Sequence, residues 1–182
     1  QYFFSMDREE LPFNRAQRAW VARAAKRVDS TLAFGSTKPL NRPGDIFFLN
    51  SAYPPTAEEI AAHQPSPLVF GEGFVPHPYT APSFFNISAM SYGALSGPAI
   101  AALSAGAHAS GTWLNTGEGG LSPFHRTAPC DLVFQIGTAK YGVRDENGHL
   151  DRQQVAELAA IPELKMFEIK LSQGAKPGKG GI

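Results

Sequence analysis

The stretch Lys165-Met166-Phe167-Glu168-Ile169-Lys170-Leu171 alternates between apolar and polar residues as a half-buried β-strand does. Consecutive side chains of a strand point to opposite faces, so the three apolar residues share a face that suits packing under helices. Glu168 and Lys170 share the other face, which points inward if the sheet closes into a barrel. A buried charge such as Lys170 is costly when it is unpaired, so this strand predicts a partner or a ligand on its inner face.

Three earlier segments are also predicted to be strands, and helices stand among them. The strands are Ser83–Met90, Thr112–Asn115 and Asp131–Gly137. Strands that alternate with helices are typical of a parallel sheet, so the fold class is α/β with about four strands. Residues 116–130 carry no helical period, and this crossover is therefore expected to be irregular.

Two helices of this region have clear start and stop signals. Ser96 supplies a capping hydroxyl before Gly-Pro, which favours a helix start, and Gly111 is a plausible end. Asp151 and Gln154 resemble a capping box that opens the next helix, and Pro162 ends it. Both signals place a helix between two predicted strands.

Ligands of parallel α/β folds bind beyond the carboxyl ends of the strands. The inner faces of the four predicted strands end there in polar or soft residues: Met90, Asn115, Gln135 and Lys170. Either these groups bond to neighbours within the sheet, or they contact a polar ligand across the strand ends. Four such ends in succession favour the ligand. The glycine-rich loops after the first two strands agree, because glycine lets backbone N–H groups approach a flat or anionic ligand.

Residues 1–80 differ from residues 81–182 in their many prolines and aromatic residues. Asn14 caps one clear helix, which has an apolar stripe through Trp20 and a basic opposite face. We interpret that face as solvated, with contact to anionic lipid as the alternative. A short helix is expected over Thr56–Ala62, and frequent prolines break longer elements. We therefore divide the chain into a helical and irregular lead-in, 1–80, and an α/β segment, 81–182.

The composition excludes several classes of protein. The 182 residues carry 16 Lys+Arg and 16 Asp+Glu, and this balance argues against a nucleic-acid-binding surface. The single cysteine, Cys130, excludes an internal disulfide and is expected to be a buried thiol. No metal site is predicted, because the five histidines lack metal-ligand spacing, and His125 is expected to be structural. The terminal residues, Gln1 and Ile182, suggest an internal segment of a longer protein.

Four motifs follow one another over residues 84–181. They are Ser88-Ala89-Met90-Ser91-Tyr92-Gly93-Ala94-Leu95-Ser96-Gly97-Pro98, Asn115-Thr116-Gly117-Glu118-Gly119-Gly120, Gln135-Ile136 with Lys140-Tyr141-Gly142-Val143, and Lys170 with Gln173-Gly174-Ala175-Lys176-Pro177-Gly178. In this order they resemble the FMN-binding synthase domain of the glutamate synthase family. The resemblance implies that residues 81–182 are the N-terminal part of a (β/α)8 TIM barrel with FMN at its mouth. Residues 1–80 resemble the lead-in of the stand-alone, single-domain relatives.

The resemblance also implies an activity: reductive amination of 2-oxoglutarate to L-glutamate, through 2-iminoglutarate, with a hydride from reduced FMN. Carried over by motif, the residues that contact FMN are Ala89, Met90, Ser91, Asn115, Gln135 and Lys170. The catalytic residues are Glu118, Lys170 and Lys176, and the substrate is held by Glu118, Gln173 and Lys176. Electrons would come from ferredoxin or a pyridine-nucleotide reductase, and any 3Fe–4S cluster would be ligated beyond Ile182. The implied location is the cytoplasm, with a membrane attachment before Gln1 left open.

Two departures from the family pattern concern the substrate and the nitrogen source. Ile182 stands where the family has a polar glutamine that touches substrate, so the resemblance implies FMN more directly than 2-oxoglutarate. No amidotransferase domain is recognised, so ammonia is expected to be free or to come from a partner. Two alternatives stay open: an FMN-binding module of the same fold with another substrate or no turnover, and a flavin-free lyase that forms a Schiff base at Lys170. With about four strands, the segment alone is expected to bind FMN poorly and to expose sheet edges.

Overall fold

The computed structural model describes residues 13–27, 43–46, 49, 51–63 and 66–173. The chain divides into two compact units, residues 1–58 and 59–182, which are described separately. In the first unit, α1 (Arg15–Ala25) begins with a reciprocal capping box, in which Asn14 and Gln17 each bond the other's backbone N–H at 2.9 Å. This confirms the predicted capped helix. Within the described ranges, no helix combines the length and apolar character needed to cross a membrane.

The short helix expected over residues 56–62 is also present. It is α2, which spans Ala57–Ala62. None of its residues is buried.

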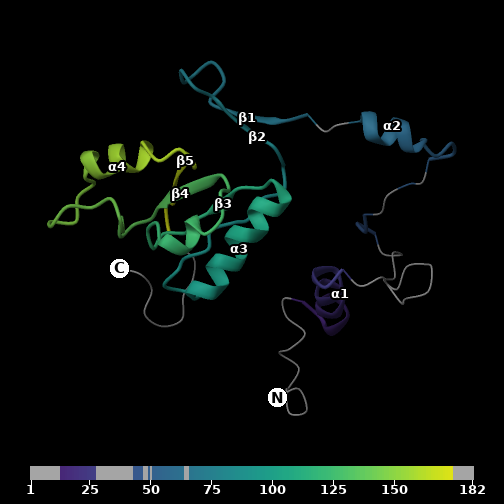
Figure 1. Ribbon diagram of the computed structural model, residues 1–182, viewed down its shortest axis with the longest axis horizontal. Coiled ribbons are helices and arrows are strands. Elements are labelled where there is room, and N and C mark those ends of the chain that lie inside the picture. The colour runs from purple at the N-terminus through teal and green to yellow at the C-terminus, as the bar shows by residue number, and fades with distance from the viewer. Residues whose placement is uncertain (1–12, 28–42, 47–48, 50, 64–65, 174–182) are drawn as a thin grey trace, which may run out of the picture. The chain divides into compact units, whose positions relative to one another are not determined.

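A three-stranded parallel sheet organises the second unit (Figure 1). Its strands are adjacent in chain order: β3 (Leu114–Asn115), β4 (Leu132–Ile136) and β5 (Leu164–Ile169). They confirm three of the four predicted strands, with slightly different boundaries. Consecutive strands of a (β/α)8 barrel have this same sequential, parallel order. In the described residues the sheet stays open and does not close into a barrel.

The prediction of a continuous first strand over Ser83–Met90 is wrong. Only Ile87 forms a bridge, which is parallel and joins it to Leu114 of β3. The reason is a contact with a residue distant in the sequence, because the Asn86 side-chain oxygen accepts from the Trp113 N–H at 3.0 Å. A side chain that takes a backbone donor in this way competes with the ladder of backbone hydrogen bonds. The segment still lies beside β3, in the position of a fourth strand.

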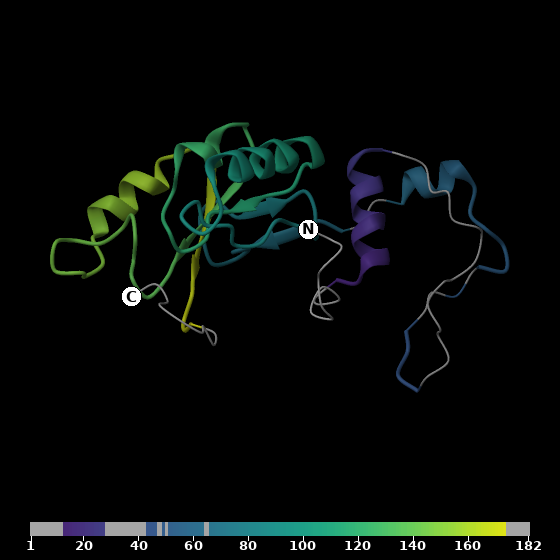
Figure 2. The ribbon, with the colours of Figure 1, turned by 90° about the horizontal axis from the view of Figure 1, so that it is seen from below.

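Helices α3 and α4 pack against one face of the sheet (Figures 1 and 2). α3 (Gly97–Ser110) begins after Ser96, whose side chain caps the first turn, and ends at Gly111 with a left-handed φ of 65°. α4 (Arg152–Ala159) begins after Asp151, whose carboxylate accepts two backbone N–H groups of the first turn. Both helices confirm the prediction, since their caps are local signals.

The hydrophobic core lies between these helices and the face of the sheet that carries Leu132 and Phe134. Its buried members are Ala107, Leu114, Cys130, Leu132, Phe134, Val143 and Leu164. Cys130 is buried, as expected, and this burial raises the pKa of its thiol. The opposite face of the sheet carries Gln135 and Glu168, as the alternation predicts.

A β-hairpin that the sequence analysis did not predict packs at the amino ends of β3 and β4. Its strands are β1 (Leu68–Phe70) and β2 (Tyr79–Ala81), which pair in antiparallel orientation. The Phe70 ring meets Trp113, the residue before β3, edge-on at 5.6 Å between centroids. The Tyr79 hydroxyl donates to Asp131, the residue before β4, at 2.8 Å. The hairpin therefore covers the end of the strands opposite to the predicted site.

We predict that Tyr79→Phe in the full-length protein lowers the free energy of unfolding by about 1 kcal/mol, the usual net value of one hydrogen bond. Burial and the neighbouring Asp131 raise the pKa of Tyr79, so its hydroxyl stays a donor over the whole range of normal assays. Urea denaturation measures the change. Tyr53→Phe is the matched control, since Tyr53 is 90% exposed. Equal stability of the two variants would refute the role of the Tyr79–Asp131 bond.

Candidate active site at the carboxyl ends of the strands

Side chains from three loops meet beyond the carboxyl ends of β3, β4 and β5. Lys170 Nζ lies 3.1 Å from Glu118 Oε2 and donates to Gln173 Oε1 at 3.0 Å. Gln173 Nε2 in turn donates to Glu118 Oε2 at 2.5 Å and to Thr138 Oγ1 at 3.2 Å. Three residues predicted for catalysis or substrate binding, Glu118, Lys170 and Gln173, therefore form one hydrogen-bonded cluster. We call these three and Thr138 the mouth cluster.

A second group of polar side chains lies on the strands just below the mouth cluster. Asn115 and Gln135, which are 3% and 8% exposed, both donate their side-chain amide to Glu168 Oε1. The Asn115 bond measures 3.1 Å. The sequence analysis did not assign Glu168 to the site. The signal that could have found it is the shared face of Glu168 and Lys170 on one strand.

These contacts bear on the two interpretations of the inner face. Gln135 bonds to Glu168, and Lys170 bonds to Glu118 and Gln173, so both have protein partners. The need for a partner alone therefore does not predict a ligand here, and the predicted ligand stays a prediction.

The loop after β3 lies directly against the end of the first strand segment. Gly117 has a positive φ of 68°, and a Cβ there would come within 2.7 Å of the Ser91 backbone nitrogen. Only glycine fits this approach. Met90 N–H donates to the Asn115 carbonyl at 3.0 Å, and Met90 packs against the core. Of the predicted FMN contacts in this segment, Met90 and Ser91 are partly buried and Ala89 is exposed.

The crossover between β3 and β4 contains no α-helix, as predicted. It holds a short 3-10 helix, η2 (Pro123–Arg126), and a buried histidine, His125. Ser104 of α3 ties this crossover down, since its hydroxyl donates to the His125 carbonyl at 3.0 Å and accepts from Ala128 N–H at 3.0 Å. The irregular backbone is thus satisfied by side chains rather than by a helical ladder.

His125 links the crossover to the end of the first strand segment. Its Nδ1 accepts from the Ser122 N–H at 3.1 Å, so the ring proton belongs on Nε2, which donates to the Met90 carbonyl at 2.9 Å. Burial lowers the pKa of His125 and favours this neutral form. The expectation of a structural histidine agrees with this geometry, in which the imidazole holds the backbone of a predicted FMN contact.

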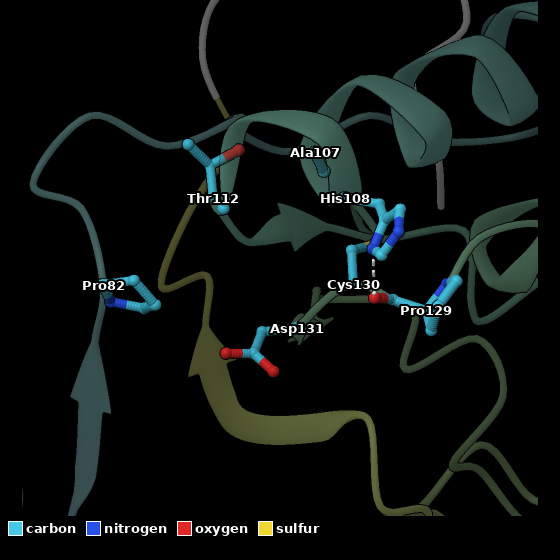
Figure 3. Close-up of a pocket in the computed structure, with 8 residues that line it drawn as sticks. Pro82, Ala107, His108, Thr112, Pro129, Cys130 and Asp131 are labelled. Atoms are coloured by element: carbon cyan, nitrogen blue, oxygen red, sulfur yellow. Dashed lines mark hydrogen bonds between the residues drawn. The ribbon is translucent and has the colours of Figure 1, made fainter.

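Two pockets lie away from these clusters. One has a volume of about 190 Å³ and lies between Pro82, the end of α3 and the start of β4 (Figure 3). There His108 Nδ1 lies 2.9 Å from the Pro129 carbonyl. Asp131 also lines it, so this pocket is at the amino end of β4. The other, of about 460 Å³, belongs to the crossover and is lined by Leu121, Ser122, Pro123 and Arg126.

Lys176 falls outside the described residues, and so does Ile182. Their roles therefore stay predictions. Across the described ranges, no three His, Cys, Asp or Glu side chains gather as a metal ion would require.

Residues 63–182 match a protein family described as the conserved region in glutamate synthase. The chain belongs to the glutamate synthase family. It is 32% identical to the glutamate synthase large subunit-like protein YerD of Bacillus subtilis strain 168, over all of this chain and 41% of that protein. It is 30% identical to a glutamate synthase large subunit-like protein of Rhizobium meliloti strain 1021, over 98% of this chain and 38% of the relative.

A shorter match reaches higher identity. The chain is 40% identical to the archaeal glutamate synthase [NADPH] of Archaeoglobus fulgidus over 94 residues, which are 52% of this chain and 16% of that relative. The chain spans about two fifths of the first two relatives, and no solved structure matches it. These relationships confirm the family that the four motifs resemble.

We predict that His125 makes the stability of the full-length protein pH-dependent. Because burial lowers its folded-state pKa below 6.5, the unfolded chain binds a proton that the native protein does not. The stabilisation is therefore complete above pH 6.5 and is lost as pH falls toward the folded value, by at most ~1.4 kcal/mol per pH unit. Urea denaturation across this window measures the slope.

His125→Gln keeps a donor for the Met90 carbonyl but cannot take up a proton, so its slope should be shallower than that of the wild type. His63→Gln, which changes an exposed histidine, is the control and should retain the wild-type slope. An unchanged slope in His125→Gln would show that another group titrates in this window.

Proposed function

We propose that the full-length protein is an FMN-dependent oxidoreductase that reductively aminates a 2-oxo acid, 2-oxoglutarate by its family, to the amino acid. The observation that carries this proposal is the mouth cluster, in which Lys170 and Gln173 both contact the carboxylate of Glu118. Membership of the glutamate synthase family supports it. We further propose that the sheet is the first half of a (β/α)8 barrel.

The residues present fit an FMN ring at the strand ends. Gly117 has no Cβ, which would clash with the Ser91 backbone. The loop after β3 and the segment at Ser91 can therefore approach each other through their backbones. Asn115 and Gln135 direct their amides to Glu168 on the inner face, and Lys170, two residues after Glu168, contacts Glu118 beyond the end of β5. FMN, when bound, would supply the hydride. The ammonium of Lys170 would then stabilise negative charge on the ring.

The mouth cluster would handle the substrate. Ammonia and a 2-oxo acid condense to an imine with loss of water. A hydride to the imine carbon and a proton to its nitrogen, together two electrons and two protons, then convert the imine to the amine. Gln173 would orient the substrate, and Glu118 is the carboxylate that could exchange a proton with its nitrogen. Lys176, by its motif, would hold a substrate carboxylate. Water must leave this cluster for these charges to act strongly.

The names of relatives support a proposal for the electron donor. Archaeal relatives are glutamate synthases whose names specify NADPH, so we propose a pyridine-nucleotide reductase or ferredoxin as the source of electrons. A 3Fe–4S cluster would be held by residues after Ile182. The proposed location is the cytoplasm. The alternative is attachment to a membrane through a segment before Gln1.

Nothing in the geometry favours the lyase alternative. A Schiff-base lysine is activated by a hydrophobic pocket or a neighbouring cation. Lys170 instead contacts a carboxylate and an amide, those of Glu118 and Gln173. A binding module without turnover would keep the same contacts. The experiment below distinguishes it from the enzyme by whether the flavin is reduced and then reoxidised by substrate.

Full-length protein purified without added cofactor should show flavin absorption bands that bleach with NADPH and its reductase or with reduced ferredoxin. Addition of 2-oxoglutarate with ammonia should restore them without air. Lys170→Ala should shift the bands, because it removes a charge beside the ring. A colourless protein that takes up no FMN would refute the proposal. Flavin that no donor reduces, or that only air reoxidises, would indicate a binding module or another substrate.

Lys176→Ala should raise the KM for 2-oxoglutarate by roughly 10- to 100-fold, or lower kcat, since a charge-assisted hydrogen bond contributes ~1.5–3 kcal/mol. FMN should remain bound. Steady-state kinetics and the flavin content measure both effects. Lys179→Ala, three residues later, is the matched control and should behave as the wild type. Loss of FMN from Lys176→Ala would move this lysine from the substrate to the cofactor.

A further inference from the structure

We infer that Glu168 is a positioning residue that fixes the orientation of the Gln135 amide, so that Gln135 presents a hydrogen-bond acceptor to the ligand. The inference rests on the proposed function, in which the ligand is FMN. The side-chain amide of Asn115 is hydrogen-bonded at both its oxygen and its nitrogen. Its Oδ1 accepts from the Gly117 N–H at 3.0 Å, and its Nδ2 donates to Glu168 Oε1 at 3.1 Å.

The orientation of Gln135 follows from the chemistry of its partner. An ionised carboxylate only accepts hydrogen bonds, so the group of Gln135 that faces Glu168 has to be its NH2. The reverse orientation would set two oxygens against each other. Glu168 therefore draws the two donor groups of Asn115 and Gln135 to a single oxygen atom.

This arrangement leaves one group of Gln135 for a ligand. The contacts of Gln135 among the described residues use its backbone and Nε2, and none uses Oε1. Within the same residues no fully buried side-chain oxygen lacks a partner, so Oε1 reaches the open side of the sheet. The strand is held firmly there, because its neighbours Phe134 and Val133 are buried.

An acceptor that cannot rotate selects a ligand with an N–H donor. The isoalloxazine ring of FMN has one such group, the imide N3–H of its pyrimidine ring. Gln135 Oε1 would accept a hydrogen bond from N3–H. Glu168 would hold the Gln135 NH2, so that the amide does not rotate and present this donor to the ligand instead. A site that hydrogen-bonds a donor rejects an analogue without that donor, because its own polar group is then left unpaired.

The test compares FMN with its N3-methyl derivative, which lacks the N–H, on the full-length protein stripped of flavin. The wild type should bind FMN at least about tenfold more tightly than the N3-methyl derivative, the equivalent of one hydrogen bond. In Glu168→Gln the amide of Gln135 gains freedom to turn, so the preference should fall to about twofold or less. Fluorescence titration measures both dissociation constants, a readout that does not depend on turnover.

Glu163→Gln is the matched control. It makes the same chemical change at the residue before β5, where Glu163 pairs with Arg126 at 3.3 Å, and should keep the wild-type preference. Gln135→Met, which has similar length and no amide, should lose the preference even if Glu168→Gln folds poorly. FMN binding with the wild-type preference in either Glu168→Gln or Gln135→Met overturns this inference alone. A wild-type protein that binds neither flavin overturns the proposed function with it.

Discussion

Hydrogen bonds between parallel strands determine the candidate site. They bring the carboxyl ends of strands that are distant in the sequence to one edge of the sheet. Thr116 N–H donates to the Val133 carbonyl at 2.9 Å, and Lys170 N–H donates to the Ile136 carbonyl at 2.9 Å. Both bonds lie where strands give way to loops. The loops that carry the mouth cluster begin directly after these bonds, so the backbone register brings their side chains together.

The crossover without an α-helix is the second condition for the site. Glu118 lies in a turn directly after β3, and the chain then passes through η2 instead of entering an α-helix. Irregular backbone inside a fold has to find hydrogen-bond partners. His125 and Ser104 supply them, and His125 also contacts the Met90 carbonyl. The same side chains thus stabilise the crossover and hold the neighbouring loop.

Local signals predicted the helices and three strands correctly, since caps and alternation are written into short stretches such as Asp151–Gln154. Features that depend on distant partners were missed. β1 and β2 are three residues each, too short for a reliable alternation, and their pairing with each other is not visible in either. The first strand failed because the Asn86 side chain takes a backbone donor 27 residues away. Glu168 was placed on the inner face but not assigned to the site, because its partners follow from the register that sets it opposite Gln135.

The charges of the site bear on the role that the proposed function gives to Lys176, which lies outside the described residues. The two polar clusters contain two carboxylates, Glu118 and Glu168, and one ammonium, Lys170. This set is net negative, and a dicarboxylate substrate entering a partly desolvated site would be repelled by it. Lys170 is already engaged by Glu118, so its charge is largely compensated. The proposed function therefore calls for a second cation to attract a 2-oxo acid, and we propose Lys176, three residues after Gln173 in the sequence, for this role.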